Sequence, residues 1–264
     1  MSKSRQEVYQ AHLTSPEKAL RPILTSLNGD ASWLMSFPRP NAERASSRKA
    51  FYHMLYEPWL KGDASMFGAW FFNVALSATA AVTDAQGVEN VIGEIEQAAA
   101  CHIPVAQASA EHEACHGGID VIMLAFHYLD HVHKPTLLAL DGSIPVIATP
   151  EAAAIVRPWN HFQTIGISHD FNSSEKSWRS PEFHPGLLPD WLTTVRLAGH
   201  AELNFCTALV WTHLTDANEE LHETILISPH GTRLDQGPLD AFLNARPKTK
   251  MLSLLLLDYA IGLK

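Results

Sequence analysis

The chain has 264 residues, of which 46% are hydrophobic and 18% are charged, a composition typical of a protein that buries a large core. The net charge is -9 with histidine neutral, and Lys and Arg are scattered along the chain, which disfavours nucleic acid as a partner. No apolar window is long enough for a membrane span and no apolar signal core follows residues 1–10, so we expect a cytoplasmic protein without a membrane partner.

The first hundred residues alternate short apolar segments with turn signals. Asn28-Gly29 predicts a β-hairpin, because this dipeptide favours the tight turns that match the twist of paired strands. Residues 65–83 are apolar, but their pattern does not decide between a strand and an insertion on the substrate side. The predicted elements are a polar helical lead at 1–22, strands at 24–27, 32–37 and 50–56, and an amphipathic helix at 88–100.

The most informative stretch runs from residue 117 to residue 149. Residues 121–126 are an uninterrupted apolar run, typical of a strand that is buried on both faces. Ligands of open α/β sheets bind outside the carboxyl ends of the strands, so the loop that follows is the first candidate for a functional site. That loop contains four potential ligands or acid/base groups, which are His127, Asp130, His131 and His133.

Beyond this loop the sequence predicts a helix near Pro135, a strand at 144–148 and then a second half that is mainly β. Thr149-Pro150 marks a helix start, with Thr as N-cap and Pro in the first turn. Residues 168–190 form the longest irregular segment, and long loops are often lids, although the sequence leaves open whether this one closes over the site. No linker separates the halves, so we expect a single domain over residues 1–264. The remaining predicted elements are strands at 205–211, 224–228 and 251–257 and a short helix at 238–243.

Several single residues have structural explanations beside the functional ones. The three cysteines form no C-x-x-C motif and are interpreted as reduced thiols. The chain has 15 histidines, so only clustering at a strand end marks a candidate ligand. Asp130 can equally cap the following helix, and His200 and His230, taken singly, can be structural. His112 and His116 are four residues apart, but the glycines beside them favour a solvated loop.

The order of these elements resembles the metallo-β-lactamase superfamily, in particular its uncharacterised fungal members. The shared features are an early hairpin, a helix, a buried strand ending in an Asp-His loop, and a β-rich second half with Gly-His before a strand. The resemblance extends from about Leu24 to the end of the chain. It implies an α/β fold, a four-layer αββα sandwich, with a metal site at one edge between two β-sheets.

The match to the family's H-x-H-x-D-H motif is partial. Its Asp-His pair falls on Asp130-His131, whereas Phe126 and Tyr128 stand where the family has its first two histidines. The family's later Gly-His falls on Gly199-His200. His230 lies near the position of a bridging aspartate, and Asp258 is the residue nearest to the family's last histidine ligand.

The departures from the family's motif leave about five plausible donors and favour one metal ion rather than two. A two-zinc site needs about seven or eight ligand atoms, whereas one metal needs only three protein ligands and a water. We therefore expect one divalent metal, with zinc ahead of iron or manganese, and a protein without metal as the alternative. The implied ligands are Asp130, His131, His133, His200 and His230.

The leading hypothesis is a metal-dependent hydrolase that uses metal-bound water to attack a small ester, thioester, lactone or lactam. Its catalytic residues would be Asp130 and His131. The first alternative is a lyase, isomerase or cyclase of specialised metabolism that uses His131, His133 or His230 as general acid and base with little or no metal. The second alternative is a non-catalytic binding relative. The sequence leaves the substrate and the oligomeric state open. Candidate substrate-binding residues are the aromatic side chains Phe126, Tyr128, Trp33 and Trp59, although tryptophans of this kind often pack in the core.

Overall fold

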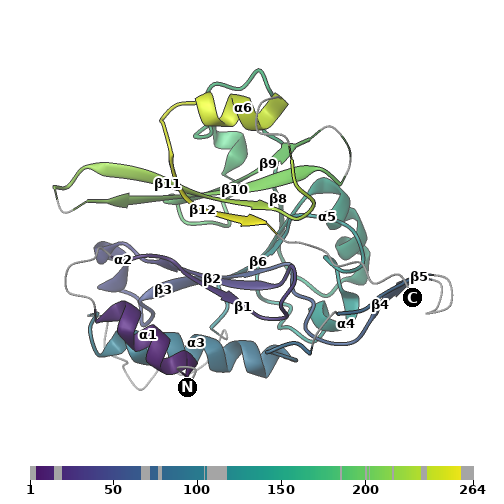
Figure 1. Cartoon of the computed structure of the whole chain (residues 1–264), viewed down its shortest axis with the longest axis horizontal. Coiled ribbons are helices and arrows are strands. Elements are labelled where there is room, and N and C mark those ends of the chain that lie inside the picture. The colour runs from purple at the N-terminus through teal and green to yellow at the C-terminus, as the bar shows by residue number, and fades with distance from the viewer. Residues whose placement is uncertain are drawn as a thin grey trace.

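The protein is a mixed α/β structure in which two β-sheets stack face to face (Figure 1). This agrees with the α/β class expected from the sequence. The computed structural model describes residues 4–14, 20–66, 72–76, 79–103, 105, 118–184, 186–199, 201, 203–215, 217–232 and 237–256.

The first sheet has six strands and changes from antiparallel to parallel along its width. β1 and β2 form the hairpin expected around Asn28-Gly29, and Gly29 adopts φ +76°, which few other residues tolerate. β3 pairs with β2 antiparallel, and the β3–β6, β6–β7 and β7–β8 pairs are parallel. In order across the sheet, the strands are β1 (Ile23–Ser26), β2 (Trp33–Pro38), β3 (Phe51–Tyr56), β6 (Val121–Leu124), β7 (Val146–Ala148) and β8 (Ile165–Ile167).

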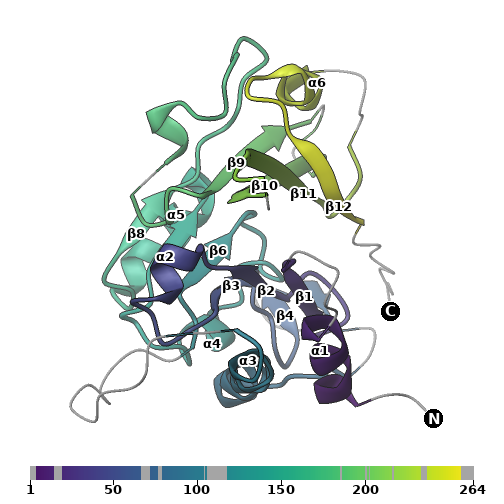
Figure 2. The same cartoon turned by 90° about the vertical axis from the view of Figure 1, so that its left-hand side faces the viewer.

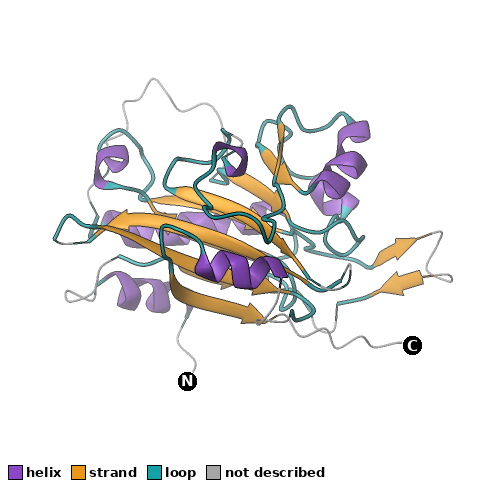
Figure 3. Cartoon of the chain, turned by 90° about the horizontal axis from the view of Figure 1, so that it is seen from above, coloured by secondary structure: helices purple, strands orange, loops and turns teal. Residues whose placement is uncertain are grey.

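The second sheet has four strands and comes entirely from the second half of the chain. β10 pairs antiparallel with both β9 and β11, and β12 pairs with β11 in parallel. A short ladder, β4 (Ala64–Met66) with β5 (Phe72–Val74), extends away from both sheets (Figure 3). The strands of the second sheet are β12 (Lys250–Leu256), β11 (Glu220–Ser228), β10 (Phe205–Leu214) and β9 (Leu192–Ala198).

Helices cover the outer faces of the two sheets. α1 and α3 lie below the six-stranded sheet and α6 lies above the four-stranded one (Figure 2). None of the helices in the described part of the chain combines the length and the apolar character needed to cross a membrane. The helices are α1 (Arg5–Leu13), α2 (Asn41–Arg44), α3 (Ala85–Ala100), α4 (Lys134–Leu137), α5 (Pro150–Val156) and α6 (Gly237–Asn244), with 3-10 turns at Arg157–Trp159 and Pro181–Phe183.

Three hydrophobic cores separate these layers. The first packs α3 and its neighbours against the six-stranded sheet, through Val88, Val91 and Ile95. The second fills the space between the two sheets and includes Phe126 and Phe205. The third lies between the four-stranded sheet and α6. The order of layers is therefore helix, sheet, sheet, helix (Figures 1 and 2).

The structure answers one question that the sequence left open and adds one strand. Three aromatic side chains of the irregular segment 168–190, Phe171, Trp178 and Phe183, are buried in the third core, so this part of the segment is packed against the four-stranded sheet. Residues 165–167 form strand β8, which the sequence pattern did not predict. His112, His116 and Cys115 lie outside the described residues.

Candidate active site

The candidate site lies at the carboxyl ends of the parallel strands β3, β6, β7 and β8, here called the carboxyl edge. Glu57 directly follows β3, and the loop with Asp130 and His131 follows β6. Because β3 and β6 are parallel neighbours, their carboxyl ends share this edge.

The backbone of Glu57 is fixed on both sides. Its N–H donates to the Met123 carbonyl at 2.9 Å, and its own carbonyl accepts from Ser32 Oγ at 2.7 Å. Glu57 has φ +45°, a left-handed conformation that is costly for a residue with a Cβ. Such a conformation persists only where the surrounding structure determines it. The position of the Glu57 side chain is therefore set by contacts with β6 and with the β1–β2 turn.

Glu57 and His131 form a buried carboxylate–imidazole pair. Nδ1 of His131 donates to Oε2 of Glu57 at 2.7 Å, and both residues are fully buried. Burial raises the pKa of Glu57 above its ordinary value, although His131 opposes the shift. Burial alone would lower the pKa of His131, but the nearby carboxylates of Glu57, Asp130 and Asp30 outweigh it and raise the pKa. The pair therefore retains a proton more firmly than either group would alone.

Asp130 connects this pair to the surface. Its Oδ2 lies 3.5 Å from Nε2 of His131, and its side chain is 14% exposed whereas that of His131 is 1% exposed. Asp30, in the β1–β2 turn, interacts electrostatically with both residues, and burial raises the pKa of its carboxyl group. Glu57, His131 and Asp130 thus form a series from the core to the surface in which Asp130 is the member that solvent reaches.

Aromatic rings surround the other side of His131. The buried ring of Phe126 is the centre of this aromatic cluster, and Tyr128, at its margin, is 38% exposed. Burial lowers the pKa of His230, which favours its neutral form. Because the rings come from the loop after β6, from β10 and from the turn after β11, the cluster joins the two sheets. Centroid distances from Phe126 are 4.5 Å to Tyr128, 4.8 Å to His127, 4.9 Å to Phe205, 5.1 Å to His131 and 6.4 Å to His230.

The other residues selected from the sequence have different positions. His133 bonds Thr136 Oγ1 through Nδ1 at 2.8 Å, and its ring lies 6.1 Å from that of Trp59. Trp59 is fully buried and donates from Nε1 to the Gly62 carbonyl. Trp33 is partly buried and packs against the core between the sheets. His200 and Asp258 lie outside the described residues.

The described members of the expected ligand set do not form a metal centre. Among the residues that the structure describes, no three His, Cys, Asp or Glu side chains converge to hold a metal ion. The centroids of the His131 and His230 rings are 6.4 Å apart. His133 has the separate partners given above. The described donors therefore do not fit the expected mononuclear site, and we derive no step through a metal.

Sequence reasoning missed Glu57, Asp30 and Phe205 as members of this site. Glu57 had a weak signal, since it is a carboxylate directly after the buried segment 50–56. Asp30 stands in a turn whose Asn-Gly pair already explains its polarity. Phe205 begins a strand and looks like any core aromatic residue. Only their positions relative to His131 mark these residues as parts of the site.

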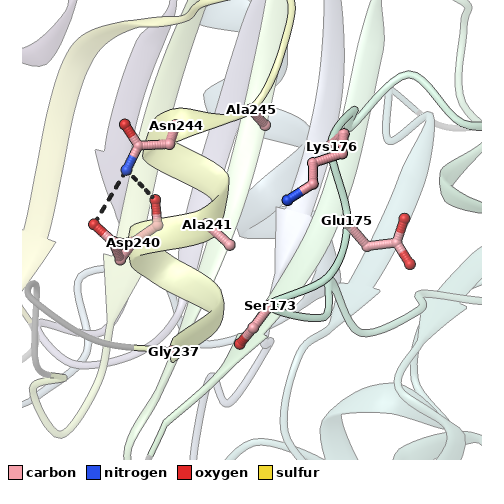
Figure 4. Close-up of a pocket in the computed structure, with 8 residues that line it drawn as sticks. All are labelled: Ser173, Glu175, Lys176, Gly237, Asp240, Ala241, Asn244 and Ala245. Carbon is pink, nitrogen blue, oxygen red and sulfur yellow. Dashed lines mark hydrogen bonds between the residues drawn. The ribbon is translucent and has the colours of Figure 1, made fainter.

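Two hollows lie elsewhere on the molecule. One, of about 320 Å³, lies between α6 and residues 173–176 and is lined by Ser173, Lys176 and Ala241 among others (Figure 4). Another, of about 300 Å³, lies between α3 and the turn before β7, with Glu89 and Asp141 in its lining. Neither is lined by a residue of the Glu57–His131–Asp130 series.

No protein-family model and no curated protein matches the sequence. Among solved structures, the chain is similar to isothiocyanate hydrolase from Delia radicum gut bacteria, with 14% identity, a TM-score of 0.46, and coverage of 90% of this chain and 86% of that one. It is also similar to a possible metal-dependent hydrolase from Veillonella parvula, with 9% identity, a TM-score of 0.41, and coverage of 78% and 62%. Both TM-scores are below 0.5, so the function proposed below rests on the geometry of the site.

Proposed function

We propose that the chain is a hydrolase of a small ester, thioester, lactone or lactam, in which Asp130 activates the attacking water and the Glu57–His131 pair supports Asp130. The observation that carries this proposal is the buried hydrogen bond of 2.7 Å between Glu57 and His131, with Asp130 3.5 Å beyond. A carboxylate that orients an imidazole, with the second ring nitrogen directed at a reacting group, is a recurrent arrangement for acid–base catalysis.

In this mechanism Asp130 is the group that contacts the substrate. It accepts a proton from water while the water oxygen forms a bond to the carbonyl carbon. It returns that proton to the leaving oxygen, sulfur or nitrogen as the bond to carbon breaks. His131, held in position by Glu57, lies behind Asp130 with Nε2 3.5 Å from Oδ2, and the surrounding carboxylates raise the pKa of this imidazole.

The aromatic cluster supports an organic substrate. Tyr128 is exposed at the margin of the site, while Phe126 and Phe205 support it from the core. Pockets for small molecules combine such apolar and aromatic walls with a few polar groups that fix orientation. Phe126 is fully buried and acts through the rings it holds in place.

Metal-dependent hydrolysis is the second candidate, and one observation favours it. Histidines that bind metals usually donate their other ring N–H to a carboxylate, as His131 does to Glu57. Of the expected ligands, His200 is not among the described residues. Two non-hydrolytic alternatives remain. One is lyase, isomerase or cyclase chemistry through the same acid–base groups, and the other is a binding function without catalysis. The following experiment separates both from hydrolysis.

The experiment compares turnover of 4-nitrophenyl acetate, a thioester and an aromatic lactone by the unmodified chain, by Asp130→Asn and by Asp240→Asn. Asp240 is a matched control because it lies on α6, over the opposite face of the second sheet. We expect Asp130→Asn to lose activity about 100-fold or more and Asp240→Asn to retain it. Equal activity of both variants, or no turnover of any probe, would contradict the proposal.

Elemental mass spectrometry of protein purified without chelator separates the two hydrolytic candidates. Active protein with no stoichiometric metal agrees with acid–base chemistry by the chain's own residues. About one equivalent of zinc, iron or manganese, lost together with activity in His131→Ala, favours the metal-dependent candidate.

A further inference from the structure

The surroundings of His131 carry an excess of negative charge. Asp30 and Asp130 are the partly exposed carboxylates there, and Glu57 lies behind them. Oε1 of Glu57 is buried without a hydrogen-bond partner among the described residues, although it belongs to the carboxylate that holds His131. Three carboxylates thus surround one imidazole, whose single positive charge cannot balance them.

Two basic side chains near this edge, Arg196 and Lys134, have partners of their own. Arg196 is 9% exposed, and its Nη1 lies 3.5 Å from Glu151 and 3.6 Å from Asp170, which follow β7 and β8. Lys134, at the start of α4, places its ammonium over the ring of Trp159 at 5.2 Å. Among the described residues no ion pair joins Arg196 or Lys134 to Asp30 or Asp130, and the Arg196 guanidinium lies over the ring of Phe205 at 5.5 Å. The groups that approach His131 itself are therefore carboxylates.

The aromatic cluster lies next to His131, the ring that Asp130 approaches. Tyr128 is exposed, and the rings of His127 and His230 are partly exposed around Phe126. Rings of this kind attract a cation over their faces, and an aromatic ring beside a carboxylate is a common way to hold an alkylated ammonium group.

We propose that the site takes a substrate that carries an alkylammonium group, which lies between the carboxylates of Asp30 and Asp130 and the rings of Tyr128 and His230. The inference rests on the proposed function, because that function places the substrate at the carboxyl edge. The new element is that the substrate carries a positive charge. The aromatic rings distinguish an organic cation from a hydrated metal ion, because an alkylammonium group gains from apolar contact and a hydrated ion does not.

Isothermal titration of the full chain with choline and with its neutral isostere 3,3-dimethylbutan-1-ol tests this inference without any turnover. We expect choline to bind at least about tenfold more tightly than the alcohol, because the two differ mainly in the charge that the carboxylates and rings recognise. The preference should weaken as salt is added, since the carboxylates are partly exposed. Equal affinity, or binding of neither probe, would overturn the inference.

Three variants locate the binding. Tyr128→Leu removes an exposed ring and Asp30→Asn removes one charge, so each should reduce the preference for choline several-fold. Glu175→Gln, in the hollow beside α6, should leave it unchanged. Tyr128 is exposed, so Tyr128→Leu should fold normally. This variant tests the inference even if Asp30→Asn is unstable. An unchanged preference in Tyr128→Leu, or preferential binding of the anion 3,3-dimethylbutyrate, contradicts the assignment.

The two proposals can fail independently. Selective binding of choline without hydrolysis of any ester would refute the hydrolase and leave the cation site standing. Hydrolysis of 4-nitrophenyl acetate that depends on Asp130, without any preference for choline over the neutral alcohol, would refute the cation site alone.

Discussion

Glu57 and His131 are 74 residues apart in the chain, yet Oε2 of Glu57 accepts a hydrogen bond from Nδ1 of His131 at 2.7 Å inside a fully buried environment. The pairing of β3 with β6 makes this contact possible, since it places the ends of both strands side by side. The protonation of His131 is therefore controlled by a residue from another part of the chain.

Glu57→Gln should lower the pKa of His131, because the variant removes the negative charge that contributes most to raising it. The shift is measured directly by NMR titration of the His131 ring, independently of any activity. In active protein, the decline of kcat/KM on the alkaline side should move to lower pH, since the imidazolium behind Asp130 is lost earlier. An unchanged His131 titration in Glu57→Gln would show that the pair does not control the proton.

The same pair predicts how stability depends on pH. The pKa of His131 is raised above its ordinary 6.5, so its contribution is fully present below that value and is lost as pH rises through the higher folded pKa. The pKa of Glu57 is raised above 4.5, and its contribution is likewise lost as pH rises. The unfolding free energy, measured by urea unfolding, should therefore fall as pH rises from 4.5. The fall should be smaller in a Glu57→Gln, His131→Gln double variant.

Asp120 should be essential for stability, not for the site. It precedes β6, at the end opposite the carboxyl edge, where Oδ1 accepts from Arg39 at 2.8 Å and Lys49 at 2.7 Å, and Oδ2 accepts from the backbone of His53 at 2.8 Å. Asp120→Ala removes the carboxylate that two cations and one N–H share, although Arg39 keeps the Phe51 carbonyl and Lys49 the Gly118 carbonyl. We expect a loss of about 3 kcal/mol in unfolding free energy. Protein that remains folded should bind choline normally, and a loss of binding without a loss of stability would contradict this division of roles.

Phe126→Ala should be strongly destabilising, because this fully buried ring contacts five others and its removal leaves a cavity between the sheets. Large-to-small substitutions of this kind cost about 3–5 kcal/mol. The exposed Tyr128 provides the comparison, and Tyr128→Leu should change stability by about 0.5 kcal/mol or less. Both values come from chemical denaturation. Similar costs for the two variants would mean that the cluster is not centred on Phe126.

Thr149→Ala tests a feature that was predicted from the sequence. The Thr149 side chain accepts from the backbone N–H of Ala152 at 3.3 Å and caps α5. Removing such a cap costs about 1 kcal/mol. Thr149→Ser keeps the oxygen and should retain most of the stability, so equal destabilisation by Ala and Ser would indicate that the methyl group, not the cap, matters.

The local structure could be predicted from the sequence. The hairpin at Asn28-Gly29, the buried strand at 121–124, the helix within 85–100 and the cap at Thr149 were all predicted, because each depends on residues a few positions apart. The sequence also indicates that Asp130 and His131 follow a buried strand and therefore lie at its carboxyl end. The metal ligands implied by the family resemblance remain predictions, with His200 outside the described residues and His133 bonded to Thr136.

The surroundings of His131 depend on tertiary contacts that no sequence pattern indicates. Glu57 comes from the end of β3, Asp30 from a turn, Phe205 from the second sheet and His230 from the turn after β11. No periodicity connects these residues, because the pairing of parallel strands and the stacking of two sheets bring together positions that are far apart in sequence. The physical reason is that burial and hydrogen bonding act over the few ångströms between neighbouring strands, whereas a sequence pattern reports only the neighbours along one strand or helix.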